Sequence, residues 1–255
     1  MDLTTVDLLW VAGAAVAAGL ANALAGGGTL ITFPMLTAVG VPAVAANVTN
    51  TVALCPGFLG GVFAQREDFR GQRRRLAYAL PAGTLGGLLG GLLLLQTEER
   101  AFQALVPYLI LGATALLAVQ VPVRNWLQRR ADRHGAVRLG DAVASVPIGT
   151  AAIYGGYFGA GLGVILLAVV GLLFDDTLTR LNALKQAVAL VANVAAAVFF
   201  VFSGQVIWPA ALVMSIGALV GGSLGGRLAG RLPAEVLRRV VVAIGLVAAA
   251  FYFSR

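Results

Sequence analysis

The sequence predicts an all-α polytopic membrane protein made of two inverted repeats of five segments each. Its 255 residues are 59% hydrophobic and 11% charged, with a mean hydropathy of +0.90, whereas a soluble domain carries about 25% charged residues. Its apolar runs recur at a fixed offset, and its basic breaks alternate between the two copies. This composition excludes an ordinary soluble domain.

The basic residues report membrane topology. Fourteen of the eighteen basic residues lie in three short breaks, 66–75, 124–138 and 227–239. Lys and Arg concentrated between apolar runs mark cytoplasmic loops. We therefore interpret the net charge of +7 as a topology signal and expect the lipid bilayer as partner, with no nucleic acid.

The sequence contains ten apolar runs, which we take as the helical elements. The runs lie near 8–25, 28–41, 43–64, 76–96, 101–121, 141–158, 162–174, 178–203, 206–226 and 234–253. The second and seventh have only about 13–14 residues, too short to cross a hydrocarbon core of roughly 30 Å. We expect eight to ten transmembrane segments, with the second and seventh short or re-entrant.

An internal duplication relates the first five runs to the last five. A shift of 135 residues places Gly26 on Gly161, Gly28 on Gly163 and Asn47 on Asn182 without a gap. The same shift places one glycine quartet on another: Gly86, Gly87, Gly90 and Gly91 on Gly221, Gly222, Gly225 and Gly226. The predicted organisation is a first repeat at 1–123, a basic cytoplasmic linker at 124–140 and a second repeat at 141–255.

The charges predict that the two repeats are inverted. The break at 66–75 is rich in Arg, but its counterpart at 203–205 has no charge. Conversely, 97–100 is mainly acidic, while the second-copy break at 227–239 is basic. If basic breaks face the cytoplasm, equivalent loops lie on opposite sides, and both termini are non-cytoplasmic.

A polar stretch inside the eighth run carries the candidate binding residues. Lys185, the single lysine of the chain, lies between Asn182 and Gln186. In a helix starting near Thr177 it would lie roughly 12 Å along the axis, deep enough that an ammonium needs a partner. The alternative is a lysine that snorkels to the interface. Snorkelling does not explain the matching polar stretch in the first copy, so we favour an anion site.

That matching stretch is Asn47-Val48-Thr49-Asn50-Thr51, in which Asn50 aligns with Lys185 and Thr51 with Gln186. Glycine-rich breaks precede both short runs, and a half-helix that starts there offers free N–H groups. The predicted substrate-binding set is Lys185, Asn182, Gln186, Asn47, Asn50, Thr51, Gly27, Gly28, Thr29, Gly161 and Gly163. Glycines four apart at 83–91 and 217–225 are typical of helix packing instead. They are also compatible with a homodimer.

These motifs resemble the TauE/SafE-type sulfite exporters, also called the toluene sulfonate uptake permease family. The resemblance is carried by Gly-Gly-Gly before Ile31-Thr32-Phe33-Pro34, by Asn47 to Asn50, by Gly161 to Gly163 and by Arg180 to Gln186. It covers nearly the whole chain. It implies a multi-pass permease of the bacterial inner membrane for sulfite or small organosulfur anions.

The expected function is therefore secondary transport of a small sulfur-containing oxyanion by alternating access, with the site at the repeat interface. A passive anion channel is the alternative, and a membrane assembly subunit is a third hypothesis. An intramembrane enzyme is disfavoured, because no apolar run pairs a serine or cysteine with a base. We expect no cofactor and no metal site, since Cys55 is the single cysteine.

Overall fold

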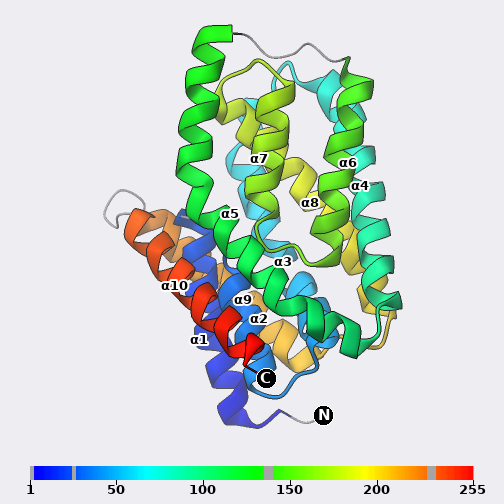
Figure 1. The fold of residues 1–255 in the computed structure, drawn as a ribbon, viewed down its shortest axis with the longest axis vertical. Coiled ribbons are helices and arrows are strands. Elements are labelled where there is room, and N and C mark those ends of the chain that lie inside the picture. Colours follow the sequence, from blue (N-terminus) through cyan, green and yellow to red (C-terminus); the bar gives the residue numbers. More distant parts are fainter. Residues whose placement is uncertain (1–2, 25–26, 135–139, 229–233, 255) are drawn as a thin grey trace.

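The chain folds into a bundle of α-helices, seen in a computed structural model that describes residues 3–24, 27–134, 140–228 and 234–254 (Figure 1). The first copy contributes α1 (Thr5–Leu24), α2 (Thr29–Ala38), α3 (Ala43–Ala64), a 3-10 turn (Arg66–Phe69), α4 (Arg73–Gln96) and α5 (Glu99–His134). The second contributes α6 (Asp141–Tyr157), α7 (Leu162–Leu173), α8 (Leu178–Phe202), α9 (Trp208–Leu228) and α10 (Ala234–Phe253). Within the described residues there is no strand, so the all-helical prediction is confirmed.

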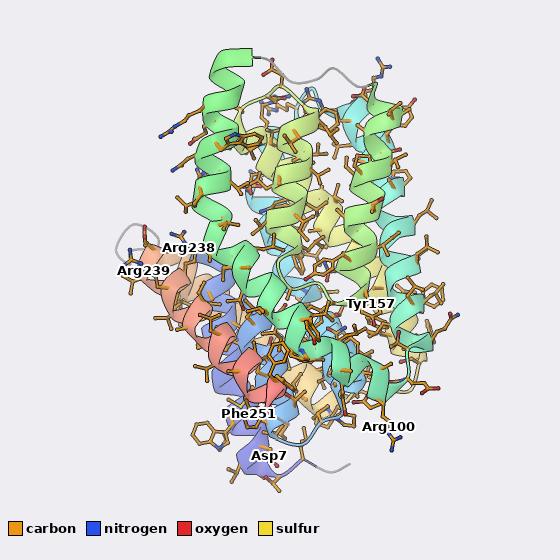
Figure 2. The ribbon with its side chains drawn as sticks, in the orientation of Figure 1. Asp7, Arg100, Tyr157, Arg238, Arg239 and Phe251 are labelled. Carbon is orange, nitrogen blue, oxygen red and sulfur yellow. The ribbon has the colours of Figure 1, made fainter. Side chains whose placement is uncertain are left out.

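Helix lengths agree with a membrane protein that has two half-length segments. Seven helices of the described chain are long and apolar enough to cross a membrane. The helices α2 and α7 have only 10 and 12 residues, as the sequence predicts. Large apolar side chains such as Trp10, Phe63 and Phe202 are exposed. Figure 2 shows another exposed one, Phe251, on the outside of the bundle, where a bilayer would cover it.

Glycines in left-handed backbone create the two breaks. Gly27 has a φ of +85° before α2, and Gly159 and Gly161 each have a φ of +79° before α7. An L side chain is disfavoured in this region, so glycine is the residue that lets the chain turn there. The predicted first break also includes Ala25 and Gly26, which lie outside the described residues.

Helix packing follows the duplication found in the sequence. The 135-residue shift places α1 on α6, α2 on α7, α3 on α8, α4 on α9 and α5 on α10. The two most extensive contacts are α4 with α6 and α1 with α9, which are the same contact once the copies are exchanged. Each copy therefore lends one long helix, α4 or α9, to the other copy (Figure 1).

Small residues allow these exchanged helices to approach closely. Gly87 of α4 lies against the backbone of Ala192 in α8, and the backbone of Gly156 in α6 lies against Gly87. In the other half, Gly217 and Gly221 of α9 lie against α1 at Ala15 and Val16. The glycine seams predicted from four-residue spacing are thus packing surfaces, as in other membrane bundles.

The helix α5 is longer than its apolar run and continues through most of the predicted linker to His134. It is visibly bent in Figure 1 and contains Pro107 and Pro122, and interior prolines kink helices. A Cβ on Gly27 would lie 2.7 Å from Leu117, and one on Gly161 would lie 3.3 Å from Leu116. Neighbouring residues of α5 thus touch both glycine turns.

We expect Gly87→Ala to destabilise the protein by about 1–3 kcal/mol, because the new methyl group would collide with backbone that cannot move away like a flexible side chain. The matched control is Gly112→Ala in α5, where a Cβ has no neighbour within 4 Å. There the better helix propensity should add about 0.5–1 kcal/mol. Thermal unfolding in detergent measures both, and equal melting temperatures would contradict the packing role of Gly87.

Candidate functional site

In the first copy, Asn50 of α3 makes its hydrogen bonds with the first turn of α2. Thr32 Oγ1 donates to Asn50 Oδ1 at 2.5 Å, and Asn50 Nδ2 donates to Thr29 Oγ1 at 3.4 Å. Thr32 and Asn50 are both almost fully buried. This half is a closed network in which neutral groups meet each other's hydrogen-bonding needs.

In the second copy, Lys185 of α8 corresponds to Asn50 and lies against the first turn of α7. A Cβ on Gly163 would lie 3.8 Å from Lys185 Nζ. Within the described chain, Lys185 has neither a hydrogen bond nor an ion pair, and the N–H of Gly163 has no acceptor. An ammonium and a free N–H at a helix N-terminus therefore lie close together, and both carry positive charge density.

The two halves differ in chemistry at equivalent positions. The 135-residue shift aligns Asn50 with Lys185, Thr29 with Val164 and Thr32 with Leu167. The hydroxyl groups that satisfy Asn50 in the first copy are thus replaced by apolar side chains beside Lys185. The second half-site is left with donors and no protein acceptor among the described residues.

The other predicted binding residues take several roles. Asn47 is buried and donates through Nδ2 to the carbonyl oxygen of Tyr157 at 2.7 Å, while its Oδ1 has no partner in the described chain. Thr51 donates to the carbonyl oxygen of Asn47 at 3.0 Å. Gln186 faces α3, because a Cβ on Gly61 would lie 2.6 Å from its Nε2. Asn182 is half-buried beside them on α8.

The glycines also divide between the two halves. The N–H of Gly28 donates to Asn22 Oδ1 at 2.7 Å, so in this structure it is already occupied. Gly27 is covered by Leu117. Gly161 is the N-cap of α7, two residues before Gly163 in the first turn of that helix. Of the predicted binding residues, Lys185 and Gly163 keep open donors in the described chain, while Asn47 in the first copy keeps an unpaired acceptor, Oδ1.

A charged cluster fixes the start of α8, two turns before Lys185. Asp176 accepts hydrogen bonds from Arg75 of α4, from Arg180 at 2.9 Å and from the N–H of Thr177 at 2.8 Å. Gln72 Nε2 also donates to the carbonyl oxygen of Arg180 at 3.0 Å. Burial alone would raise the pKa of Asp176, but these donors together hold that pKa below its ordinary value. The cluster ties the first copy to α8.

One charged residue of α5 was expected in a loop. Arg124, which the sequence places at the start of the linker, lies within α5, and its side chain is exposed. The predicted run ended near residue 121, so the basic side chain was interpreted as part of a loop. The four-residue spacing of Gln120 and Arg124 was the available signal that both share one helix face.

Comparison with known proteins identifies the family. The model of the family described as sulfite exporter TauE/SafE matches residues 11–252. The chain belongs to the TauE/SafE family. Similar proteins include the probable membrane transporter protein YfcA of Escherichia coli K12, 25% identical over 92% of this chain and 86% of that protein. No solved structure matches.

Two further relatives of this TauE/SafE protein have similar names. A probable membrane transporter protein of Haemophilus influenzae is 27% identical over 91% of this chain and 89% of its own length. The probable membrane transporter protein ORF9 of a Sinorhizobium species is 26% identical over 97% of this chain and 93% of its own length. The chain is therefore a multi-span membrane transporter, and this membership argues against an enzyme.

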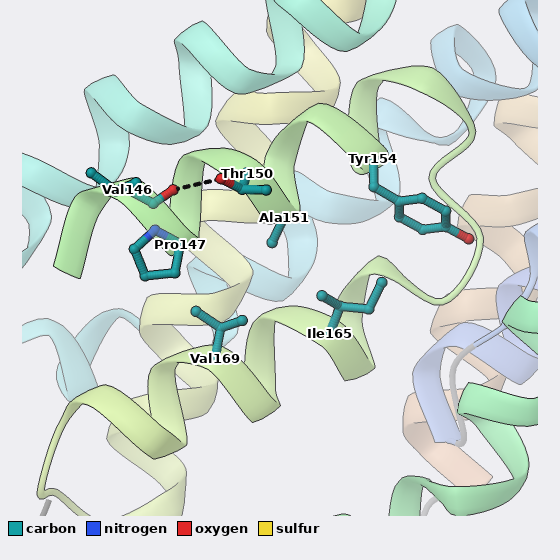
Figure 3. A pocket seen from close by; sticks show the side chains of 7 residues that line it. All are labelled: Val146, Pro147, Thr150, Ala151, Tyr154, Ile165 and Val169. Carbon is teal, nitrogen blue, oxygen red and sulfur yellow. Dashed lines mark hydrogen bonds between the residues drawn. The ribbon is translucent and has the colours of Figure 1, made fainter. Parts of the chain in front are cut away.

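An apolar groove of about 610 Å³ lies between α6 and α7 (Figure 3). Its lining is mostly aliphatic, including Ile165 and Val169. Its two hydroxyl groups already donate within the protein, Thr150 to Val146 and Tyr154 to Ala160. The groove therefore offers no free donor to an anion and is not the candidate site.

We expect Asp176→Asn to cost about 2 kcal/mol at neutral pH, because the hydrogen bonds from Arg75 and Arg180 lose their charged acceptor. Since the folded-state pKa is lowered, the ionised carboxylate stabilises the protein above the unfolded value of about 3.9. That contribution disappears as the pH falls from about 3.9 through the lower folded-state value.

Melting temperatures measured against pH test this expectation. The matched control is Asp175→Asn, since Asp175 is exposed and its replacement should leave the melting curve nearly unchanged. A constant difference between wild type and Asp176→Asn down to the lowest pH would contradict the ionic role of Asp176.

Proposed function

We propose that this TauE/SafE transporter carries a small sulfur-containing anion, such as sulfite or an organosulfonate, by alternating access at the interface of two inverted repeats. The observation that carries the proposal is the unpaired ammonium of Lys185 beside the free N–H of Gly163. The corresponding location of the protein is the bacterial inner membrane, where it would act as a permease. The rest of the proposal follows from what such a pair of donors can bind.

An ion inside a membrane-spanning helix is expensive unless it is paired. Charged side chains in such segments face cavities or partners and mark substrate pathways. At Lys185 the described chain provides a cation and a helix N-terminus but no carboxylate. A small oxyanion supplies the missing charge and accepts from both donors at once.

The short helices support alternating access. Transporters with inverted repeats place broken helices at the repeat interface and rock one bundle against the other. Here α2 and α7 are the short helices, and both their breaks touch α5 through Leu116 and Leu117. The exchanged contacts of α1 with α9 and of α4 with α6 are those expected if the two copies are related by a two-fold axis, with inversion following from the charge pattern.

Sulfur chemistry enters through the family description, sulfite exporter. The names of the relatives specify membrane transport without a substrate. A sulfite or sulfonate group presents three oxygen acceptors in a compact head, which matches convergent N–H donors from Lys185 and α7. Its small size also suits a site between packed helices.

Lys185→Met tests the site directly. Purified wild type should be stabilised against heat by at least one of sulfite, sulfate, thiosulfate, taurine and sulfoacetate, and Lys185→Met should lose that shift because the cation is gone. The control Arg100→Gln also removes one positive charge. Arg100 is exposed and follows the end of α4. The start of α4, at the opposite end of that helix, is the part that contacts Asp176 near α8. Replacing Arg100 should therefore leave the shift unchanged.

Flux in proteoliposomes then separates a transporter from a channel. Transport that saturates with anion concentration in wild type and falls at least ten-fold in Lys185→Met is the expected result. Equal thermal shifts in wild type and Lys185→Met would remove Lys185 from the site. Flux that rises linearly without saturation would favour the passive channel instead.

Gly163→Ala probes the second donor. The methyl group would lie 3.8 Å from Lys185 Nζ, an ordinary van der Waals distance, so the protein should fold normally. That methyl group would occupy the space in which the anion meets both donors, and we expect anion affinity to fall roughly ten-fold, equivalent to about 1.4 kcal/mol. Isothermal titration with the anion found in the screen measures this, and unchanged affinity would place the anion away from α7.

A further inference from the structure

The glycines at the start of the two short helices have different surroundings, although the 135-residue shift aligns Gly28 with Gly163. A Cβ on Gly28 would lie 2.6 Å from Asn22 Nδ2 and 2.7 Å from the carbonyl oxygen of Ala18. Among the described atoms, a Cβ on Gly163 would come within 4 Å of Lys185 Nζ alone, at 3.8 Å. Protein therefore fills the space beside the first glycine, whereas a cation borders the space beside the second.

Asn22 of α1 is the side chain that occupies the amide of Gly28. Its Oδ1 accepts a hydrogen bond from the N–H of Gly28 at 2.7 Å, across six residues of the chain. A carboxamide oxygen is a neutral acceptor, so it satisfies a donor at the start of α2 that an anion would otherwise meet. The first half-site therefore carries its own acceptor.

In the second copy, the position of Asn22 is taken by Tyr157, the last residue of α6 (Figure 2). The tyrosine side chain is held away from α7. Its hydroxyl lies 3.3 Å from Thr97 Oγ1, and its ring packs edge-on against Phe102 with centroids 5.7 Å apart. Gly163 follows six residues after the tyrosine, and its N–H has no acceptor among the described residues.

The backbone around position 157 is held independently of the tyrosine ring. Asn47 Nδ2 of α3 donates to the carbonyl oxygen of Tyr157 at 2.7 Å. The hydroxyl of Tyr154 donates to the carbonyl oxygen of Ala160 at 2.6 Å. Both bonds end on main-chain oxygens of the turn between α6 and α7, so a different side chain at position 157 leaves both acceptors in place.

We propose that the residue six positions before each glycine decides which half-site binds the anion: Asn22 is an internal ligand that closes the α2 amide, and Tyr157 leaves the α7 amide open. This inference rests on the proposed function. A side chain six residues away in the same chain competes with any solute at a high effective concentration. Tyr157 is then a specificity-determining residue that acts without touching the anion, and one anion binds per protein, in the second copy.

Transfer of the first-copy side chain to the second copy tests the proposal. Tyr157→Asn places a carboxamide where Asn22 stands in the first copy, and it should weaken anion binding roughly five-fold, the worth of about one hydrogen bond. The measurement is isothermal titration with whichever of sulfite, sulfate, thiosulfate, taurine and sulfoacetate stabilises wild type. The matched controls are Tyr157→Phe, which loses the hydroxyl, and Tyr157→Leu, which also loses the ring. Neither adds an acceptor, so both should bind as wild type does.

Hydrogen exchange resolved to single residues follows the two amides directly. In wild type without anion, the N–H of Gly163 should exchange faster than that of Gly28, because only Gly28 has an acceptor. A saturating anion should slow exchange at Gly163 and leave Gly28 unchanged. In Tyr157→Asn, Gly163 should be protected before any anion is added. The wild-type comparison decides the matter even if Tyr157→Asn gives no folded protein.

The opposite results separate this inference from the proposed function. Equal affinity in Tyr157→Asn and wild type, or an equal loss in Tyr157→Leu, would overturn the role of position 157 while the anion site at Lys185 stands. Protection of Gly28 by the anion in wild type would overturn the role of Asn22 in the same way. If wild type binds none of the five anions, the proposed function fails and this inference fails with it.

Discussion

An ammonium group in a membrane-spanning helix needs negative charge nearby, and the described chain provides none at Lys185. This constraint organises the rest of the molecule. Helix α7 starts at a glycine turn, and the free N–H of Gly163 lies in its first turn beside Lys185. On the proposed function, a small anion would supply the charge that the described chain leaves out.

The duplication explains how such an unbalanced site can persist in a stable fold. In the first copy, Asn50 with Thr29 and Thr32 forms a closed neutral network at the equivalent place. That network can stay packed because Asn50, Thr29 and Thr32 satisfy one another. Because α4 and α9 each pack against helices of the other copy, they join the half-site at Lys185, called here the open half, to the closed network at Asn50. The open half is held in shape by contacts far from its charge, including the Asp176 cluster at the start of α8.

Much of this arrangement could be predicted from sequence, because it depends on local chemistry that repeats. The apolar runs set the ten helices, the glycines set the two short ones, and the constant offset identified Asn50 as the counterpart of Lys185. What could not be predicted depended on tertiary contacts. Asn22 occupies the N–H of Gly28, a side-chain contact that the spacing of the glycines does not predict. Arg124 was interpreted as a loop residue because hydropathy ends before the helix does.

The difference between the copies also bears on how an inverted pair could work. A symmetric pair of charged half-sites would place two ammonium groups across the axis and make the empty state costly. With Asn50 in one copy and Lys185 in the other, the charge is on one bundle only. If alternating access rocks the bundles, the anion then stays with α7 and α8 while the neutral half moves past it. On the proposed function, binding and movement would then be divided between the copies, and the difference between Asn50 and Lys185 at aligned positions would have a physical reason.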